Sequence, residues 1–164
     1  MKTFDNPDVI ITDVMDSHAK WRAQKPALIY RNRRVTWAAF NQRINRVANG
    51  LIKRGLKKSD KVSLLTTNCI EALEILFGVI KAGGVIVPLS AMVQGEALAR
   101  MVIDSDSRFL FAGPGQIESI APHYSLFTRI AGDGFFVLGD AVDGWESYQS
   151  LVDDGTDQKP GVHL

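Results

Sequence analysis

The spacing of apolar residues along the chain predicts alternating helices and strands. Near the N-terminus, apolar positions recur at roughly helical spacing over Val9–Arg22, and Pro26 ends that pattern. Two short runs, Ala27–Tyr30 and Arg34–Trp37, then flank a polar R-N-R turn. Short apolar runs separated by a few polar residues are typical of a β-hairpin. The first third of the chain is therefore predicted to contain a helix followed by a small hairpin.

The segment after this hairpin predicts a long amphipathic helix. Its apolar residues repeat every three or four positions, and they are Trp37, Phe40, Ile44, Val47 and Leu51. Thr36 is suited to cap the N-terminus of this helix, because its hydroxyl can accept a hydrogen bond from a free backbone N–H. Gly55 is suited to end it.

From Asp60 onward the pattern changes to strands alternating with helices. The expected strands are Lys61–Thr66, Val85–Leu89, Arg108–Ala112, Arg129–Ala131 and Phe135–Leu138. The expected helices are Cys69–Ala82 with Asn68 as its cap, Gly95–Asp104, a short one within Gly113–Ile120, and Gly144–Leu151. This order predicts the α/β class, a mostly parallel sheet flanked by helices and joined by right-handed crossovers.

Two of these helices differ in the burial that their composition predicts. Only Glu71, Glu74 and Lys81 interrupt the apolar surface of helix Cys69–Ala82, so most of that helix is expected to be buried. The strand Val85–Leu89 that follows it is expected to be short and buried as well. Helix Gly95–Asp104 carries one apolar face, formed by Leu98, Met101 and Val102, and is expected at the surface.

Length and composition are those of an ordinary globular domain. The 164 residues are 46% hydrophobic and 23% charged, which suffices for one core and predicts a single α/β subdomain over residues 1–164. The apolar runs are too short to cross a bilayer, and the acidic N-terminus lacks the apolar stretch of a signal peptide. Because Cys69 is the only cysteine, no internal disulfide can form, and we expect a cytoplasmic location.

The net charge of +1 hides a strong asymmetry along the chain. The segment Ser17–Ser59 contains twelve bases and no acid. On the predicted long helix, Arg46 and Lys53 lie opposite the apolar stripe, and Arg43 and Arg54 flank it. One interpretation is a solvated face balanced by acids later in the chain; the other is a surface for an anionic partner such as nucleic acid or a membrane. We favour the first and expect no nucleic acid, because aromatic residues do not alternate with the bases.

Candidate chemical motifs in the strand-following loops give little support for a site. Gly113-Pro-Gly115 follows a strand as a pyrophosphate-binding loop would, but Glu118 occupies the position of the third glycine, so we interpret it as a plain turn. A receiver-like domain would need carboxylates at the strand ends for a divalent ion. The segments Thr66–Asn68 and Pro88–Ser90 contain none.

The single cysteine and the three histidines form no pattern typical of a nucleophile or a metal site. Cys69 would lie in the first turn of a helix, where a thiolate is favoured, yet a cysteine in an apolar helix is more often a small buried hydrophobe. His18, His123 and His163 are scattered and lack metal-ligand spacing. We therefore assign no catalytic residue and no metal ligand, and the cofactor-binding residues stay unknown.

Two stretches, in order, carry motifs that are similar to those of a known enzyme family. The first runs from K-P-A-L-I-Y at Lys25–Tyr30 through R-R-V-T-W-A-A-F to N-R-V-A-N-G-L at Asn45–Leu51, and it is similar to the motif Leu-Thr-Tyr-x-Glu-Leu. The second, I-K-A-G-G-V-I-V-P-L at Ile80–Leu89, is similar to Leu-Lys-Ala-Gly-x-x-x-Val-Pro-Leu. Together, the two stretches resemble the adenylate-forming acyl-CoA synthetase family of AMP-dependent synthetases and ligases. Ala39 replaces the family's glutamate, and Ser90 replaces a commoner asparagine or aspartate.

The resemblance extends well over Lys25–Phe111 and implies the N-terminal portion of the large AMP-binding domain. Enzymes of this family activate a carboxylic acid with ATP and Mg to an acyl-adenylate, and then transfer the acyl group to coenzyme A. No segment matches the family's phosphate-gripping loop, its later nucleotide motifs or the lysine of its small C-terminal domain. The resemblance thus implies an N-terminal fragment that is inactive alone and binds no cofactor itself. ATP, Mg, coenzyme A and a carboxylic acid are implied for the full-length enzyme only.

Two other hypotheses stay open at this point. The chain could be a stand-alone basic module that binds an anionic partner through Ser17–Ser59. It could also be a complete nucleotide-binding domain of an unrelated type, which the missing third glycine disfavours. A part of a larger domain would expose apolar surface that could drive homodimer formation.

Overall fold

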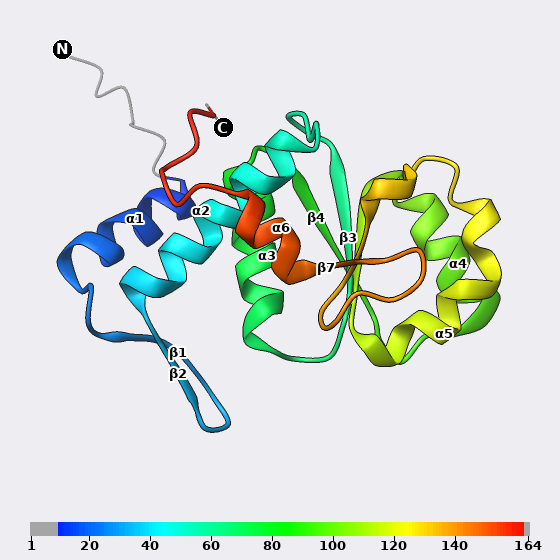
Figure 1. Cartoon of the computed structure of the whole chain (residues 1–164), viewed down its shortest axis with the longest axis horizontal. Coiled ribbons are helices and arrows are strands. Elements are labelled where there is room, and N and C mark those ends of the chain that lie inside the picture. The colour runs from blue at the N-terminus through cyan, green and yellow to red at the C-terminus, as the bar shows by residue number, and fades with distance from the viewer. Residues whose placement is uncertain (1–9, 163–164) are drawn as a thin grey trace, which may run out of the picture.

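The computed structural model describes residues 10–162. Within them, a five-stranded parallel sheet lies between two layers of helices, and a two-stranded antiparallel hairpin projects from the N-terminal side (Figure 1). The predicted α/β class, parallel sheet and hairpin are therefore confirmed. Val9, where the first helix was expected to begin, and His163 lie outside the described residues.

The N-terminal part follows the sequence prediction closely. Its elements are α1 (Ile11–Trp21), β1 (Pro26–Tyr30), β2 (Arg33–Thr36) and α2 (Trp37–Lys53), and β1 pairs with β2 in antiparallel register. The Thr36 hydroxyl caps α2 by accepting a 3.3 Å hydrogen bond from the backbone N–H of Ala39. Gly55 follows the helix with a φ of 84°, the left-handed conformation that favours glycine at a helix end.

The parallel sheet has the strand order β4-β3-β5-β6-β7. Its strands are β3 (Lys61–Leu65), β4 (Val85–Leu89), β5 (Ser107–Ala112), β6 (Phe135–Val137) and β7 (Glu146–Ser147). The chain runs from β3 outward to β4, returns past β3, and continues in the other direction from β5 to β7. The direction of winding therefore reverses between the adjacent strands β3 and β5, which makes this pair the topological switch point of the sheet.

Helices cover both faces of this sheet. They are α3 (Ile70–Lys81), α4 (Gly95–Asp104), α5 (Ile117–Ile120) and α6 (Tyr148–Asp154), with the 3-10 helices η1 (Pro114–Gln116), η2 (Ala121–Leu126) and η3 (Gly132–Gly134). On β5, Phe109 and Phe111 join the core formed with α2, α3 and α6, whereas Leu110 and Ala112 join the core formed with α4 and α5. This alternation divides the apolar interior into two layers, as the two-residue period of a strand requires.

Three predictions from the sequence are wrong at the edges of the sheet. The strand β4 is an edge strand of the sheet, so Val85 is 47% exposed, where a buried strand was expected. Segment Arg129–Ala131, where a strand was expected, is a turn that leads into η3 and then β6. Helix Gly144–Leu151 was placed too early, since Glu146 and Ser147 first pair with β6 and only then does α6 begin.

Helix α2 is held between α3 and α6 by two close approaches. A Cβ at Gly78 of α3 would lie 2.5 Å from Cγ1 of Val47, and a Cβ at Gly50 of α2 would lie 2.5 Å from the backbone oxygen of Leu151. Side chains at either glycine would push the helices apart. The two glycines therefore permit the tight helical layer that covers one face of the sheet.

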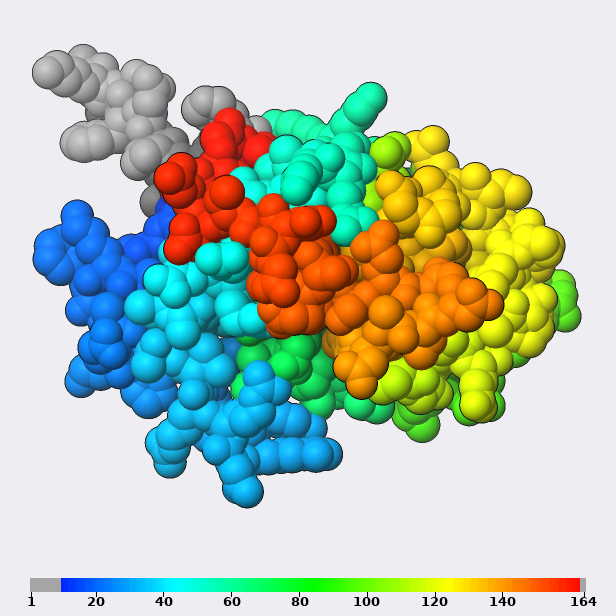
Figure 2. All heavy atoms as spheres, in the orientation of Figure 1, coloured from blue at the N-terminus to red at the C-terminus, as the bar shows by residue number. Residues whose placement is uncertain are grey.

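The residues after α6 form a strap, which we define as residues 155–160, across the outer side of α2. The Asn45 carboxamide donates to the backbone oxygen of Asp157 at 2.7 Å. The Asn49 carboxamide donates to those of Thr156 at 2.9 Å and Gln158 at 2.8 Å. Figure 2 shows these C-terminal residues lying against the N-terminal helices. The strap thus joins the two ends of the described chain.

Candidate functional site

Ligands of open α/β sheets usually bind beyond the carboxyl ends of the strands, at the switch point. In this chain the loops after β3 and β5 meet there, and the N–H of Gly113 donates to the backbone oxygen of Leu65 at 2.9 Å. A Cβ at Gly113 would approach Oε1 of Gln116 to 2.6 Å and Oγ1 of Thr66 to 2.9 Å. Gly113 is therefore explained by the close approach of two loops.

The rest of the Gly113–Gly115 segment supports the turn that the sequence predicted. Residues Pro114–Gln116 form the single 3-10 turn η1, and nothing lies within 4 Å of a Cβ built at Gly115. Glu118 is exposed at the start of α5, where its carboxylate would repel a phosphate. These residues do not fit a pyrophosphate.

A buried polar network lies close to the same edge, between α2, α3 and α6. Oε2 of Glu74 accepts a 2.7 Å hydrogen bond from Nε of Arg43 and a 2.6 Å hydrogen bond from the phenol of Tyr148. Glu74 is only 1% exposed, and its second carboxylate oxygen has no hydrogen-bond partner among the described residues. An ion pair this deeply buried holds its three elements in one arrangement, because separating any partner would leave an uncompensated charge.

The electrostatics of this network favour a charged Arg43 and a neutral Tyr148. Burial, and then the neighbouring Glu74 carboxylate, raise the pKa of Tyr148 well above its usual value of 10. Partial burial is the largest single influence on Arg43 and lowers its pKa, but the hydrogen bond with Glu74 and the further interactions with Tyr148 and Glu74 together outweigh it, so the pKa is raised. The phenol is therefore a permanent hydrogen-bond donor to Glu74 at neutral pH, and neither group is poised for proton transfer.

A polar cavity of about 260 Å³ opens beside this network. It is lined by Arg43, Glu71, Leu138, Gly139, Asp140, Ser147, Tyr148 and Gln149. Nη1 and Nη2 of Arg43 lie 3.4 Å from Oε1 of Gln149, and Glu71 pairs with Arg33 at 2.7 Å. Most of the charges around the cavity are thus already paired with one another, so the cavity shows no dominant charge for one class of ligand.

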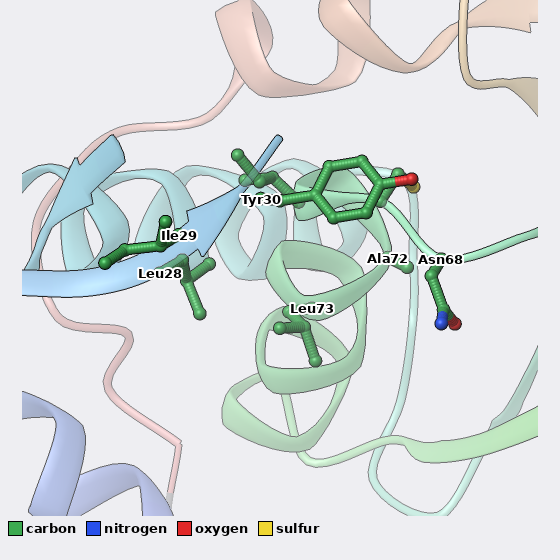
Figure 3. A pocket seen from close by; sticks show the side chains of 8 residues that line it. Leu28, Ile29, Tyr30, Asn68, Ala72 and Leu73 are labelled. Atoms are coloured by element: carbon green, nitrogen blue, oxygen red, sulfur yellow. The ribbon is translucent and has the colours of Figure 1, made fainter. Parts of the chain in front are cut away.

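A second, apolar cavity of about 220 Å³ lies between the hairpin and the N-terminal turn of α3 (Figure 3). It is lined by Leu28, Ile29, Tyr30, Asn68, Cys69, Ile70, Ala72 and Leu73. No residue in this set was singled out from the sequence as a ligand-binding group. Its walls come from two segments about forty positions apart, which only the packing of the hairpin against α3 brings together.

Cys69, His18 and His123 lie on different elements of the described chain. Cys69 is half-buried and precedes α3 as its N-cap residue, a position that the sequence gave to Asn68; neither side chain caps the helix. Burial is the main cause that raises the pKa of the Cys69 thiol, so it is not an activated thiolate. The ring of His18 lies against that of Trp37, with centroids 4.6 Å apart, and His123 lies on η2.

Lys81 is a buried cation that the sequence did not reveal. It is only 3% exposed, and its ammonium donates to the carboxylate of Asp16 on α1 and, at 3.0 Å, to the side-chain oxygen of Asn41 on α2. Lys159 of the strap pairs with the same Asp16 at 3.0 Å. Burial lowers the pKa of Lys81 despite these partners. The lysine is therefore a structural clamp between three helices.

Glu74 and Lys81 were expected to interrupt the buried surface of α3, and the structure corrects this expectation. Both face α2 with the apolar residues, while Leu73 is exposed. Their spacing of seven residues does place them on one helical stripe, which was the available signal. The partners that satisfy them could not be read from that spacing. Likewise, Met101 of α4 is exposed, whereas Leu98, Ala99 and Val102 are buried.

The basic segment Ser17–Ser59 is partly neutralised by acids of the same chain. Its ion pairs are Arg33–Glu71, Arg43–Glu74, Lys53–Asp154, Arg54–Glu146 and Arg54–Asp154. Arg54 is the most enclosed of these bases, and its guanidinium also lies 5.1 Å from the ring centroid of Phe136. The interpretation in which later acids balance the block accounts for these four bases.

Residues 10–162 contain no group of three or more His, Cys, Asp or Glu side chains that could hold a metal ion. In the same range, no helix is long and apolar enough to cross a bilayer. The features described above are the Arg43–Glu74–Tyr148 network, the Lys81–Asp16 ion pair, one polar cavity and one apolar cavity.

The sequence of this chain is similar to those of known proteins. A model of the family described as AMP-binding enzyme matches residues 15–153. The chain is 32% identical over 106 residues to 4-hydroxybutyrate–CoA ligase 2 of Metallosphaera sedula, which covers 65% of this chain and 19% of that protein. It is 28% identical over 143 residues to the fatty acid–[acyl-carrier-protein] ligase ScoC of Streptomyces coeruleorubidus, covering 87% and 26% respectively.

Solved structures show the same fold. A putative long-chain-fatty-acid CoA ligase from Rhodopseudomonas palustris superposes with a TM-score of 0.87 at 21% identity, over 95% of this chain and 39% of that one. The anthranilate CoA ligase AuaEII, solved with anthranoyl-AMP, gives a TM-score of 0.84 at 21% identity, over 90% and 28%. The chain thus spans between about a fifth and two fifths of the length of these proteins.

Proposed function

The chain belongs to the AMP-binding enzyme family, and we propose that it forms the N-terminal part of the large domain of an ATP-dependent acid–thiol ligase. The observation that carries this proposal is the family match over residues 15–153, together with a fold shared over nearly the whole described chain. The relatives named as ligases of acyl groups with coenzyme A or a carrier protein support the same reaction class.

The proposed reaction of the whole enzyme has two steps. A carboxylate oxygen of the acid attacks the α-phosphorus of ATP, giving an acyl-adenylate and releasing pyrophosphate. The thiol sulfur of coenzyme A then attacks the acyl carbon, a thioester forms, and AMP leaves while the thiol proton passes to solvent. A fatty acid as substrate and a cytoplasmic location are part of this proposal.

Within the described residues, the chain supplies the framework for this chemistry. The Gly113–Gly115 turn does not fit the phosphates of ATP, and residues 10–162 hold no carboxylate cluster for Mg. The framework consists of the parallel sheet and of the Arg43–Glu74–Tyr148 network, which fixes α2, α3 and α6 against it.

An exchange assay tests the proposal directly. Carboxylate-dependent exchange of labelled pyrophosphate into ATP should be absent when the 164-residue chain is incubated with aliphatic and aromatic acids. A relative such as the M. sedula ligase provides the positive control. Exchange by the 164-residue chain that is abolished by removing the acid would contradict the proposal that this chain supplies only the framework of the enzyme.

Reading the coding sequence downstream of Leu164 provides a second test. We expect a loop rich in Ser, Thr and Gly and ending in Gly-x-Pro-Lys-Gly within a few tens of residues. A stop codon at that point would overturn the proposal. It would favour the basic module instead, for which the exposed cations Lys20, Arg22 and Lys25 are the supporting observation.

A further inference from the structure

Helix α1 carries a stripe of apolar side chains that remains exposed to solvent. Ile11 is 50% exposed, Val14 37% and Trp21 76%, and we call these three residues the apolar stripe. At about 100° per residue, they fall within roughly 80° of one another around the helix axis. Met15, on another side of the helix, is buried against α2. The helix therefore packs on the protein with one side and presents a second apolar surface to solvent.

The end of α1 and the turn after it are basic. Lys20, Arg22 and Lys25, which we call the basic turn, are exposed, and the ion pairs of the described residues involve none of them. The Lys20 ammonium lies 4.9 Å from the centroid of the Trp21 ring. The N–H of Lys25 donates to the backbone oxygen of Arg22 at 2.8 Å, and that of Trp37 donates to the oxygen of Lys25 at 3.0 Å. The backbone of the turn is thus tied to the start of α2.

Both carboxylates of α1 are already paired. Asp13 and Asp16 form ion pairs with Lys159 at 2.9 and 3.0 Å. Glu71, which faces the hairpin, pairs with Arg33 at 2.7 Å. The basic segment itself contains no acid. A negatively charged surface that approaches α1 therefore meets the cations of the basic turn next to carboxylates that are already neutralised.

Two cations of the basic turn also line one surface cavity. Arg22 and Lys25 surround a volume of about 430 Å³ together with Pro26 and Trp37. The Trp37 ring lies against that of His18, with centroids 4.6 Å apart, so an aromatic wall lies beside the two cations. Hydrogen bonds from Arg and Lys to a phosphate are strengthened by charge. The cavity therefore suits the phosphate of a lipid head group.

The combination of apolar stripe and basic turn favours a membrane over other anionic partners. Tryptophan is enriched at the interface between membrane and water, because its ring is apolar and its indole N–H is polar. Helices that lie in this interface combine such residues with Lys and Arg, and anionic lipids attract each basic residue near their surface. Nucleic acid would use the cations through its phosphates but would leave Ile11 and Val14 in water.

We propose that α1 and the basic turn bind the surface of an anionic membrane, with the apolar stripe inserted at the interface and the cations on lipid phosphates. Figure 1 shows α1 and the hairpin at the end of the molecule opposite α4 and α5, so this end can rest on a bilayer while the sheet stays in water. The inference goes beyond the proposed function and does not rest on it, since lipid binding is measured without ATP or an acid.

Sedimentation with sucrose-loaded vesicles measures this binding on the 164-residue chain. Vesicles of phosphatidylcholine mixed with phosphatidylglycerol should carry the protein down, and vesicles of phosphatidylcholine alone should bind it at least roughly tenfold more weakly. Raising the salt from about 0.1 M to about 1 M should remove most of the binding, because the Debye length falls from about 10 Å to about 3 Å. Tryptophan fluorescence should shift to the blue on the mixed vesicles, since Trp21 leaves water.

A triple variant tests the cations of the basic turn. Lys20→Gln, Arg22→Gln and Lys25→Gln, combined, should weaken binding to the mixed vesicles roughly 100-fold, at about fivefold for each cation. All three side chains are exposed, so the variant should fold like the wild type, which circular dichroism checks.

A second triple variant is the matched control for net charge. Lys61→Gln, Arg100→Gln and Arg129→Gln, combined, remove the same number of charges from side chains that are 43%, 72% and 61% exposed and lie outside α1 and the hairpin. Binding of this variant should stay within about twofold of the wild type, because salt screens charges that lie more than a Debye length from the membrane.

Trp21→Ala tests the apolar stripe. It should weaken binding at least roughly fivefold, because a large apolar side chain no longer enters the interface. It should also abolish the blue shift, since Trp145 is only 3% exposed and already out of water. Met92→Ala is the control, because Met92 is 92% exposed on the loop between β4 and α4 and its replacement should change neither readout.

The wild-type measurements decide the proposal by themselves. Salt-sensitive binding to the mixed vesicles with a blue shift supports it. No binding to these vesicles, or equal binding to both kinds, would overturn it, and binding without a blue shift would overturn the insertion of Trp21. Self-association without lipid that Trp21→Ala abolishes, measured by analytical ultracentrifugation, would show that a second copy covers the stripe, and it would likewise overturn the proposal.

Discussion

Tyr148 of α6 donates a 2.6 Å hydrogen bond to the buried carboxylate of Glu74 on α3, although the two residues are 74 positions apart in the sequence. Replacing Tyr148 with Phe would remove this hydrogen bond and keep the ring, which lies at 6.4 Å from that of Phe111. Because the acceptor is a charged group, we expect a loss of about 2 kcal/mol in the free energy of unfolding.

Urea denaturation followed by circular dichroism measures this loss. Tyr30→Phe is the control, since the Tyr30 hydroxyl makes no hydrogen bond among the described residues and its removal should change the free energy of unfolding by less than about 0.5 kcal/mol. Equal effects of the two substitutions would show that the contact between α6 and α3 does not stabilise the fold.

The same tyrosine predicts that stability falls at alkaline pH. The pKa of Tyr148 is raised in the folded chain by burial first and then by Glu74, so its neutral form is the one that the fold favours. Its contribution is complete below the unfolded pKa of about 10 and is lost as the pH rises above that value. The limiting slope for one such group is about 1.4 kcal/mol per pH unit.

Burial also raises the pKa of Tyr124, to about 12, so this residue adds to the decline. The free energy of unfolding, measured in urea between pH 9 and pH 11, should therefore fall more steeply in the wild-type chain than in Tyr148→Phe. Identical profiles of the two proteins would refute the assignment of the slope to Tyr148.

At the Lys81–Asp16 ion pair, removing the carboxylate should lower the free energy of unfolding more than removing the buried ammonium. Asp16→Asn leaves the Lys81 ammonium buried beside uncharged carboxamide oxygens, without the carboxylate that balances its charge, and it should cost about 3 kcal/mol. Lys81→Met removes the buried cation and keeps a side chain of similar length. That variant should cost clearly less, because no uncompensated charge is left. Thermal unfolding at neutral pH ranks the two variants, and a larger loss for Lys81→Met would contradict the clamp.

The docking of the strap on α2 is expected to depend strongly on Gly155. A Cβ at Gly155 would lie 1.9 Å from the backbone oxygen of Arg46, so Gly155→Ala must displace the strap from α2. We expect a loss of about 2 kcal/mol and rapid hydrogen exchange over residues 156–160. Gly161→Ala is the matched control, because nothing lies within 4 Å of its Cβ. Unchanged exchange in Gly155→Ala would mean that the strap does not dock as described.

The basic segment predicts only weak, salt-sensitive binding to polyanions. We expect Lys20→Gln, Arg22→Gln and Lys25→Gln, combined, to lower retention on heparin, because these cations are exposed. Arg54→Gln should leave retention unchanged, since Glu146 and Asp154 already pair with Arg54. Tight binding of DNA at physiological salt would instead support the basic module.

The candidate site was less predictable than the fold, and the difference lies in the range of the interactions. Helix α4 was expected at Gly95–Asp104 and is found there, because apolar periodicity is a local property that acts within a few residues. The exposure of β4 and the late start of α6 were missed, since both depend on which strands become neighbours. The two cavities could not be predicted at all, because each is lined by segments far apart in the chain.

The sequence by itself determined most of the helices and strands, the α/β class and the resemblance of Lys25–Phe111 to adenylate-forming enzymes, since local periodicity and motif order are properties of the chain. Only the tertiary structure decided where the charges go. Glu74 and Lys81, polar residues in an apolar helix, are buried because Arg43, Tyr148 and Asp16 reach them from three other helices. A buried charge is stable only with its partner, and partners are chosen by packing.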